Sequence, residues 1–220
     1  MSLKSVIISA GGIGKRMGTD IPKQFLLIKG KPVIFWTIEK FYEYDATIEF
    51  IVVLPEYHVP LWETLCQKHL FTLKHKIVIG GQERFHSIKN GLTECTGKYI
   101  AVHDAVRPLV SVEVIANCFT GAEQNFACVP VVSIKESLRK VETDVSFCVN
   151  RDDYKIVQTP QIFEANLLHN AYQQNYSKLF TDDSSVVEAH GQKIFLVDGN
   201  DENIKITTPH DLLIAEQLIV

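Results

Sequence analysis

The chain has 220 residues, of which 46% are hydrophobic and 22% are charged, and its formal net charge is −4. A chain of this length can bury a full hydrophobic core, and these fractions exclude wholesale disorder and a fibrous repeat. The mildly acidic charge gives no general attraction to nucleic acid or to an anionic membrane, so we expect neither as a partner. Any anion must therefore be bound at a local site.

The cysteines and the first apolar run predict a cytoplasmic protein. The chain has five cysteines, an odd number without a C-x-x-C pair, which disfavours both a disulfide framework and a zinc site. The apolar run after Lys4 covers only residues 6–10, which is too short for the core of a signal peptide or for a membrane span. We therefore expect reduced thiols in a cytoplasmic chain.

Apolar, β-branched runs alternate with helical patterns in the first part of the chain. Strands are predicted at 5–9, 50–54, 76–79, 99–103 and 126–132. Helices are predicted between them at 33–41, 59–71, 83–92 and 112–119. Near-continuous apolar runs are typical of parallel strands that helices cover on both faces. This alternation predicts an α/β fold with a mostly parallel, twisted sheet.

The segment 133–158 departs from the alternation. Its β-like stretches at 137–141 and 145–149 flank a turn-prone spacer, which predicts a β-arm that projects from the sheet. Regular patterns resume at 165–172, 183–189, 194–197 and 209–217. Because no linker, repeat or low-complexity segment divides the chain, we expect a single domain over 1–220 with this arm as an appendage.

Glycines and cations follow the first predicted strand, at the sheet edge where doubly wound proteins bind ligands. The segment 10–18 is rich in glycine, and Lys15, Arg16 and Lys23 add positive charge. Glycines let backbone N–H groups approach phosphate oxygens closely. The segment matches neither the P-loop nor the G-x-G-x-x-G fingerprint, so a generic glycine turn with solvated lysines is the alternative.

Three further clusters follow other predicted strands. Residues 80–87 suit a planar base or an anion at a helix N-terminus, or form a simple strand-to-helix turn. Asp104 and Arg107 suit a metal-bound phosphate or a sugar hydroxyl, or form a structural ion pair, whereas His103 is expected inside the strand and is not a candidate. Lys205 either points at the same edge or merely separates two isoleucines.

Together these clusters place cations at one edge of an acidic protein. Arg16, Lys23 and Lys205 predict a polyanionic small-molecule substrate. Phosphoryl or nucleotidyl transfer requires positioning and neutralisation of charge, normally with Mg²⁺. One or two carboxylates and the substrate phosphates usually hold that ion, so a dense ligand motif is not expected and we identify no metal ligands.

The ordered motifs resemble the cytidylyltransferases that act on 2-C-methyl-D-erythritol 4-phosphate. They are SAGGIGKRM with PKQF at 9–17 and 22–25, GGQERFHS at 80–87, HDAVRP at 103–108, QTPQ at 158–161, TDDSS at 181–185 and NIKIT at 203–207. The resemblance implies a Rossmann-like fold and transfer of the cytidylyl group of CTP, with Mg²⁺ and release of pyrophosphate, in the non-mevalonate isoprenoid pathway. It also implies a homodimer formed through the arm at 133–158, which completes the neighbour's site.

The resemblance assigns roles to individual positions. The residues that contact CTP through the backbone are Ala10, Gly11 and Gly12. Those that contact cytosine are Gly81, Gln82 and Ser87. Asp104 and Ala105 lie between the ribose and the sugar alcohol phosphate in this scheme. The catalytic cations around the α-phosphate are Arg16, Lys23 and Lys205. The residues that bind the methylerythritol phosphate, some of them across the dimer interface, are Arg107, Ser137, Arg151 and Thr159.

Some positions differ from the family's usual pattern, and two other functions stay open. Gly11, Gln82, Asn150 and Glu136-Ser137 replace the common Ala, Asp, Asp and Asp-Thr; Ser137 keeps the hydroxyl, whereas Gln82 removes a charge near the base. A ribitol-5-phosphate cytidylyltransferase shares several of the motifs, although those at 150–151 and 181–185 favour methylerythritol phosphate. A non-catalytic nucleotide-binding protein is the other alternative, but such a protein is expected to have lost a phosphate-facing cation.

Overall fold

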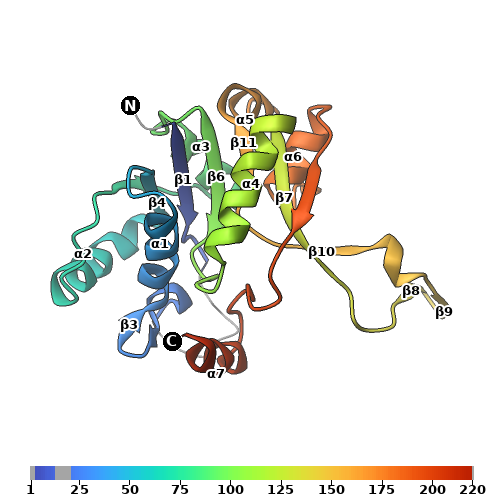
Figure 1. Cartoon of the computed structure of the whole chain (residues 1–220), viewed down its shortest axis with the longest axis horizontal. Helices are drawn as coiled ribbons and strands as arrows, with labels where there is room; N and C mark the ends of the chain where they lie inside the picture. The colour runs from blue at the N-terminus through green and yellow to red at the C-terminus, as the bar shows by residue number, and fades with distance from the viewer. Residues whose placement is uncertain (1–2, 13–20, 220) are drawn as a thin grey trace.

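The protein is described by a computed structural model, which covers residues 3–12 and 21–219 (Figure 1). Within these residues an eight-stranded sheet has the order β10-β7-β11-β6-β1-β4-β5, and β12 also pairs with β7. The strands are β1 (Lys4–Ser9), β4 (Glu49–Leu54), β5 (Lys76–Ile79), β6 (Tyr99–Asp104), β7 (Ala127–Ser133), β10 (Lys155–Val157), β11 (Gln161–Glu164) and β12 (Phe195–Asp198).

The sheet is mostly parallel, as the sequence predicts. β1 pairs in parallel with β4 and β6, β4 with β5, and β12 with β7. β10 and β11 are antiparallel to their neighbours, and β11 lies between β6 and β7. The prediction of an α/β fold with a mostly parallel sheet is therefore confirmed, while β11 is a strand that the sequence pattern did not reveal.

Helices cover both faces of the sheet, because successive residues of a buried strand point to opposite sides. In β1, Val6 and Ile8 join one core cluster and Ile7 joins the other. The first cluster is covered by α1 (Val33–Tyr44), α2 (Val59–Lys68) and α4 (Val112–Asn125). The second is covered by α3 (Arg84–Leu92), α5 (Ala165–Ala171) and α6 (Asp183–Ala189).

The C-terminal helix α7 (Pro209–Leu218) packs near the small hairpin of β2 (Leu27–Ile28) and β3 (Lys31–Pro32). It begins with a capping box in which the Thr208 hydroxyl accepts from the N–H of Asp211, and Pro209 occupies the first turn. The hairpin and α7 contribute to a third hydrophobic cluster, in which Ile28, Val106 and Ile206 are buried. The arrangement holds the segment that carries Lys205 against the ends of the strands.

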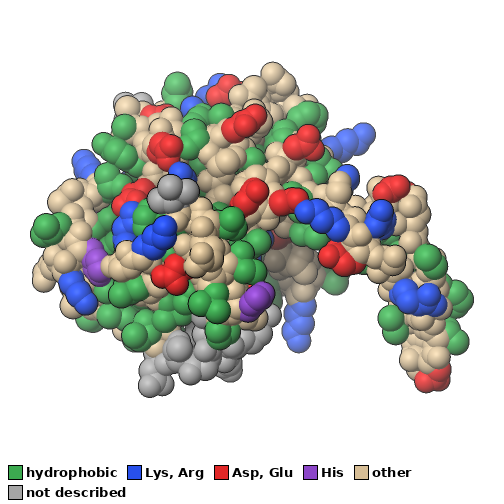
Figure 2. Space-filling view, turned by 60° about the horizontal axis from the view of Figure 1, so that its bottom comes forward, with side chains coloured by type: hydrophobic (Ala, Val, Ile, Leu, Met, Phe, Trp, Pro, Cys, Tyr) green, Lys and Arg blue, Asp and Glu red, His purple; other side chains and the backbone are tan. Residues whose placement is uncertain are grey.

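The segment after β7 leaves the body of the protein (Figure 1). β8 (Arg139–Glu142) and β9 (Val145–Cys148) form a separate antiparallel pair, and all of their residues are exposed. Hydrophobic side chains stand out on both sides of this hairpin (Figure 2), among them Val141, Val145 and Phe147. The chain then returns as β10, so both ends of the predicted arm belong to the main sheet.

The structure also contains short 3₁₀ turns at Lys23–Phe25, Glu56–His58 and Arg151–Asp153. Helix α2 ends at Lys68, earlier than the sequence predicts, and Leu70 has a positive φ of 51°. No helix among the described residues is long and apolar enough to cross a membrane.

Candidate functional site

A cleft of about 750 Å³ opens at the carboxyl ends of β1, β4, β5 and β6. This is the edge at which parallel sheets bind ligands, because the loops that follow neighbouring strands converge there. Ten of the residues that the sequence selects line this cleft: Ala10, Gly11, Gly12, Lys23, Gly81, Gln82, Ser87, Asp104, Ala105 and Lys205. Four loops and the C-terminal segment thus bring together residues that are far apart in the sequence.

The loop after β1 is fixed by a hydrogen bond from the Gln24 side chain. The buried Gln24 amide donates to the carbonyl of Ala10 at 2.8 Å, and the N–H of Ala10 donates to the carbonyl of Val53 at 3.0 Å. These bonds fix the start of the glycine loop, while Gly11 and Gly12 continue along the cleft wall. The predicted catalytic Arg16 lies outside the described residues.

The loop after β5 is packed too closely for side chains at its glycines. A Cβ on Gly81 would lie 2.4 Å from the Cβ of His86, and one on Gly80 would lie 2.9 Å from Ser87 Oγ. The N–H of Gly81 donates to Ser87 Oγ at 3.0 Å. Ser87 therefore shapes the loop from within α3, and the bare glycine backbone forms the adjacent wall of the cleft.

Asp104 is the charged centre of the cleft. Its Oδ2 lies 3.0 Å from Lys205 Nζ and 3.2 Å from Arg107 Nε. Burial favours protonation of this carboxyl, but the charges of Lys205, Arg84 and Arg107 outweigh burial and hold the pKa of Asp104 well below its ordinary 3.8. The carboxylate is therefore ionised at neutral pH and forms ion pairs with Lys205 and Arg107.

Arg107 and Thr159 contact Asp104 but do not line the cleft. Arg107 donates to the carboxylate through Nε and to the carbonyl of Asn203 through Nη1 at 2.7 Å. Thr159 is only 5% exposed, and its hydroxyl accepts from the N–H of Asp104 at 3.2 Å. Both residues thus support Asp104 in this structure.

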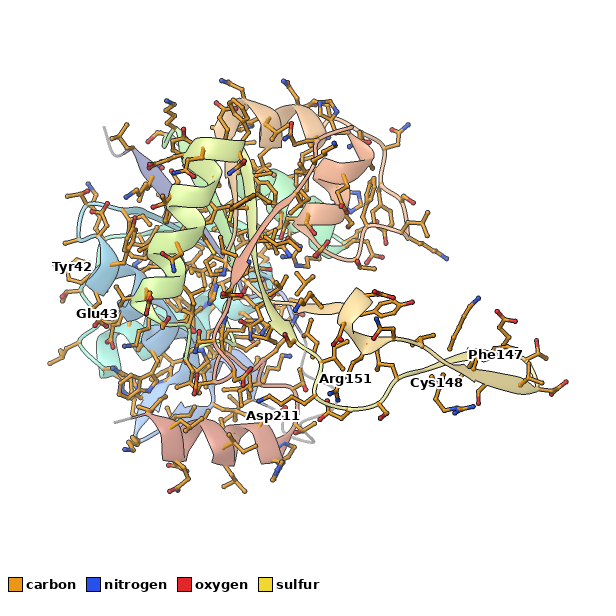
Figure 3. The ribbon with its side chains drawn as sticks, turned by 45° about the vertical axis from the view of Figure 1, so that its right-hand side comes forward. Tyr42, Glu43, Phe147, Cys148, Arg151 and Asp211 are labelled. Atoms are coloured by element: carbon orange, nitrogen blue, oxygen red, sulfur yellow. The ribbon has the colours of Figure 1, made fainter. Side chains whose placement is uncertain are left out.

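Ser137 and Arg151 lie on the projecting segment, away from the cleft residues of the same chain. Figure 3 shows Arg151 near the base of the projection and Phe147 and Cys148 farther out. The Arg151 guanidinium donates to the carbonyl of Lys135, on the other side of the arm. The chain therefore does not bring these two predicted residues to its own cleft.

Arg84 is a cleft residue that the sequence analysis did not select. Its guanidinium donates to both oxygens of Asp183, at 2.9 and 2.5 Å, and the Tyr172 hydroxyl donates to the same carboxylate at 2.6 Å. Asp183 is fully buried, and burial together with that carboxylate raises the pKa of Tyr172. Arg84 lies in the GGQERFHS motif and Asp183 in the TDDSS motif. Both are charged residues of a motif to which the sequence analysis gave no role, and this was the signal that could have identified them.

Comparison with known proteins identifies the family. The profile described as 2-C-methyl-D-erythritol 4-phosphate cytidylyltransferase matches residues 4–220. The chain belongs to the 2-C-methyl-D-erythritol 4-phosphate cytidylyltransferase family. A cytidylyltransferase of this name from Phocaeicola vulgatus is 54% identical over 98% of this chain and 99% of the relative, and one from Bacteroides thetaiotaomicron is 51% identical over 98% and 99%.

Solved cytidylyltransferases share the fold over almost the whole chain. The crystal structure of 2-C-methyl-D-erythritol 4-phosphate cytidylyltransferase from Thermus thermophilus has a TM-score of 0.80 and 29% identity, covering 99% of this chain and 98% of its own. The 4-diphosphocytidyl-2C-methyl-D-erythritol synthase from Anaerococcus prevotii has a TM-score of 0.84 and 26% identity, covering 99% and 96%. The Rossmann-like prediction is confirmed, and the chain is a cytidylyltransferase of isoprenoid biosynthesis rather than a ribitol-5-phosphate enzyme.

Proposed function

We propose that the cleft transfers the cytidylyl group of CTP directly to the phosphate of 2-C-methyl-D-erythritol 4-phosphate, giving 4-diphosphocytidyl-2-C-methyl-D-erythritol and pyrophosphate. The observation that carries this proposal is the ionised Asp104, which is paired with Lys205 and Arg107 in the cleft that the two glycine-rich loops also line. Lys23, Lys205 and the glycine backbone at 11–12 line the cleft together, which suits a triphosphate beside a second phosphate.

CTP lies along the loops after β1 and β5 in this proposal. Gly11 and Gly12 contact its phosphates through the backbone, and Ala10, whose N–H is bonded to Val53 and whose carbonyl is bonded to Gln24, lies beside them at the start of the loop. Gly81, Gln82 and Ser87 hold cytosine at the part of the cleft that they line, where close packing of Gly81 against His86 fixes the loop. Asp104 and Ala105 lie between the ribose and the acceptor.

The chemical step is an in-line displacement at the α-phosphorus. A phosphate oxygen of the acceptor forms the new bond to phosphorus, and the bond from phosphorus to the bridging oxygen of the β-phosphate breaks. The acceptor oxygen is already ionised at neutral pH, so the step needs no general base and no covalent enzyme intermediate. Arg16, Lys23 and Lys205 neutralise the charge that accumulates around the α-phosphate and on the departing pyrophosphate.

We propose Mg²⁺ as the partner of the CTP phosphates. No group of three His, Cys, Asp or Glu side chains poised for a metal occurs within residues 3–12 and 21–219. Asp104 is ionised and lies at the cleft wall, which fits an ion held by one carboxylate and the substrate's own phosphates. The ion would supply further neutralisation of phosphate charge.

We also propose that 1–220 is one catalytic domain that forms a homodimer through the arm at 133–158. Support comes from the exposed apolar side chains of β8 and β9 and from the position of Ser137 and Arg151 outside their own cleft. In the dimer these two residues of one copy, with Arg107 and Thr159 of the other, hold the acceptor. All five cysteines are free thiols, which supports a cytoplasmic enzyme.

Substitution of Lys23 tests the cleft assignment. Lys23→Ala should lower kcat for pyrophosphate release from CTP and methylerythritol phosphate about 100-fold, because a preorganised charge is lost. Lys29→Ala, at the exposed turn between β2 and β3, is the matched control and should retain full activity. Equal activity of the two variants would place the chemistry elsewhere.

A further inference from the structure

His103 is a buried side chain that the transfer chemistry leaves unused. It lies in β6 with no exposed surface, and the Phe41 ring packs edge-on against it with the ring centroids 5.0 Å apart. Its Nε2 is 3.1 Å from the carbonyl oxygen of Arg107, and its Nδ1 is 3.0 Å from Thr159 Oγ1. Both ring nitrogens are therefore engaged with residues beside Asp104.

These contacts define the tautomer of His103. A carbonyl oxygen only accepts hydrogen bonds, so the proton must be on Nε2. The ring is fully buried, and its two hydrogen-bond partners, a carbonyl and a hydroxyl, carry no negative charge to stabilise an imidazolium, so the ring is neutral and Nδ1 has no proton. Nδ1 must then accept, and the Thr159 hydroxyl must donate its single proton to it.

The Thr159 hydroxyl has a second fixed contact. The backbone N–H of Asp104 donates to Oγ1 at 3.2 Å and occupies one of its two lone pairs. With its proton and one lone pair committed, this hydroxyl can offer only an acceptor to anything else. It cannot donate a hydrogen bond to a phosphate oxygen.

The same residues close a ring of contacts around Asp104. The Asn203 side-chain amide donates to the carbonyl of Thr159 at 2.8 Å, and Arg107 donates to the carbonyl of Asn203 at 2.7 Å. Asn203 is fully buried and lies two residues before Lys205. A change at His103 or Thr159 is thereby transmitted both to Asp104 and to the segment that carries Lys205.

We propose that His103 is a positioning residue, which as its neutral Nε2–H tautomer locks the Thr159 hydroxyl and through it the backbone of Asp104. Thr159 therefore acts on the acceptor through Asp104 or through one acceptor lone pair, never as a donor to its phosphate. The functional part of this inference rests on the proposed cytidylyl transfer, whereas the tautomer and the locked hydroxyl do not.

Matched substitutions separate the lock from general packing. Thr159→Val keeps the shape of the side chain and removes the hydroxyl, while Thr159→Ser keeps the hydroxyl. His103→Gln can still donate to the Arg107 carbonyl but offers no acceptor at the Nδ1 position, whereas His103→Asn retains an acceptor there. Thr159→Val and His103→Gln should lower kcat at least about 10-fold, because displaced catalytic groups lose rate steeply.

The two conservative variants, Thr159→Ser and His103→Asn, keep the hydroxyl and the acceptor, so each should recover most of the kcat that is lost in Thr159→Val or His103→Gln. KM for CTP should not change in any of the four variants. A lower kcat with an unchanged KM for CTP is not what a general loosening of the fold would produce. Because Thr159→Val and His103→Gln break the same bond, the double variant should be no slower than the slower single variant. Additive losses, or full activity of Thr159→Val, would overturn the proposal.

Nitrogen NMR of protein with ¹⁵N-labelled histidine gives a readout independent of activity, with the His103 signals assigned by their disappearance in His103→Asn. The wild-type spectrum should show a protonated Nε2 and a bare Nδ1, and the Nδ1 signal should move in Thr159→Val but stay in place in Thr159→Ser. A protonated Nδ1 in the wild type would refute the lock. If the wild type releases no pyrophosphate with methylerythritol phosphate, the proposed function fails and this spectrum still decides the lock.

Discussion

Removing the carboxylate of Asp183 should destabilise the protein severely. Asp183→Ala leaves the Arg84 guanidinium and the Tyr172 hydroxyl without their shared acceptor. Breaking a buried ion pair by deleting one partner costs about 3–5 kcal/mol. Because Asp183 is fully buried but the Arg84 side chain is 31% exposed to the cleft, we expect the lower end, about 3 kcal/mol of the free energy of unfolding.

Urea unfolding at pH 7 measures this loss through the shift of the midpoint at unchanged slope. Asp183→Asn should cost less than Asp183→Ala, because the amide oxygen still accepts one hydrogen bond. Glu123→Ala, which removes an exposed carboxylate from α4, is the control and should change stability by less than about 0.5 kcal/mol. A loss below about 1 kcal/mol for Asp183→Ala would show that water replaces the carboxylate and would refute the reasoning.

Three further predictions follow from the cleft and the arm. Lys205→Met should lower kcat about 100-fold, and a steady-state assay in which only KM changed would contradict its transition-state role. Because burial lowers the pKa of His103 from 6.5 to about 4, the unfolded chain binds a proton first on acidification; the free energy of unfolding should fall between these pH values by up to about 3 kcal/mol. Urea titrations of His103→Asn should lack that component. Mixing inactive Arg16→Ala and Arg151→Ala proteins should restore partial pyrophosphate release if copies share sites, whereas no recovery despite confirmed subunit exchange would argue against sharing.

The parallel part of the sheet was predictable because its strands are buried on both faces. The apolar runs at 50–54 and 99–103 fall within β4 and β6. β11 has only four residues and becomes a strand through antiparallel pairing with β6 and β7, which a local pattern does not contain. The early end of α2 was also hidden, because Leu70 adopts its positive φ without a glycine or proline to signal it.

The sequence predicts which loops form the cleft, but it does not predict which side chains contact one another there. Charged and glycine-rich residues at strand ends must share one edge of a parallel sheet, so the position of Asp104 followed from the strand pattern. The Arg84–Asp183 pair joins positions 99 residues apart, and the Thr159 hydroxyl faces His103 from 56 residues away. Which side chains meet at such distances is decided by tertiary packing, about which local periodicity says nothing.

The central claim is that the cleft joins CTP to methylerythritol phosphate without a covalent enzyme intermediate. Its most direct test is pyrophosphate release by the pure protein with CTP and Mg²⁺, comparing 2-C-methyl-D-erythritol 4-phosphate, ribitol 5-phosphate and no acceptor. We predict release with the first acceptor, little with the second and none without an acceptor. A burst of pyrophosphate without acceptor, or faster release with ribitol 5-phosphate, would contradict the account.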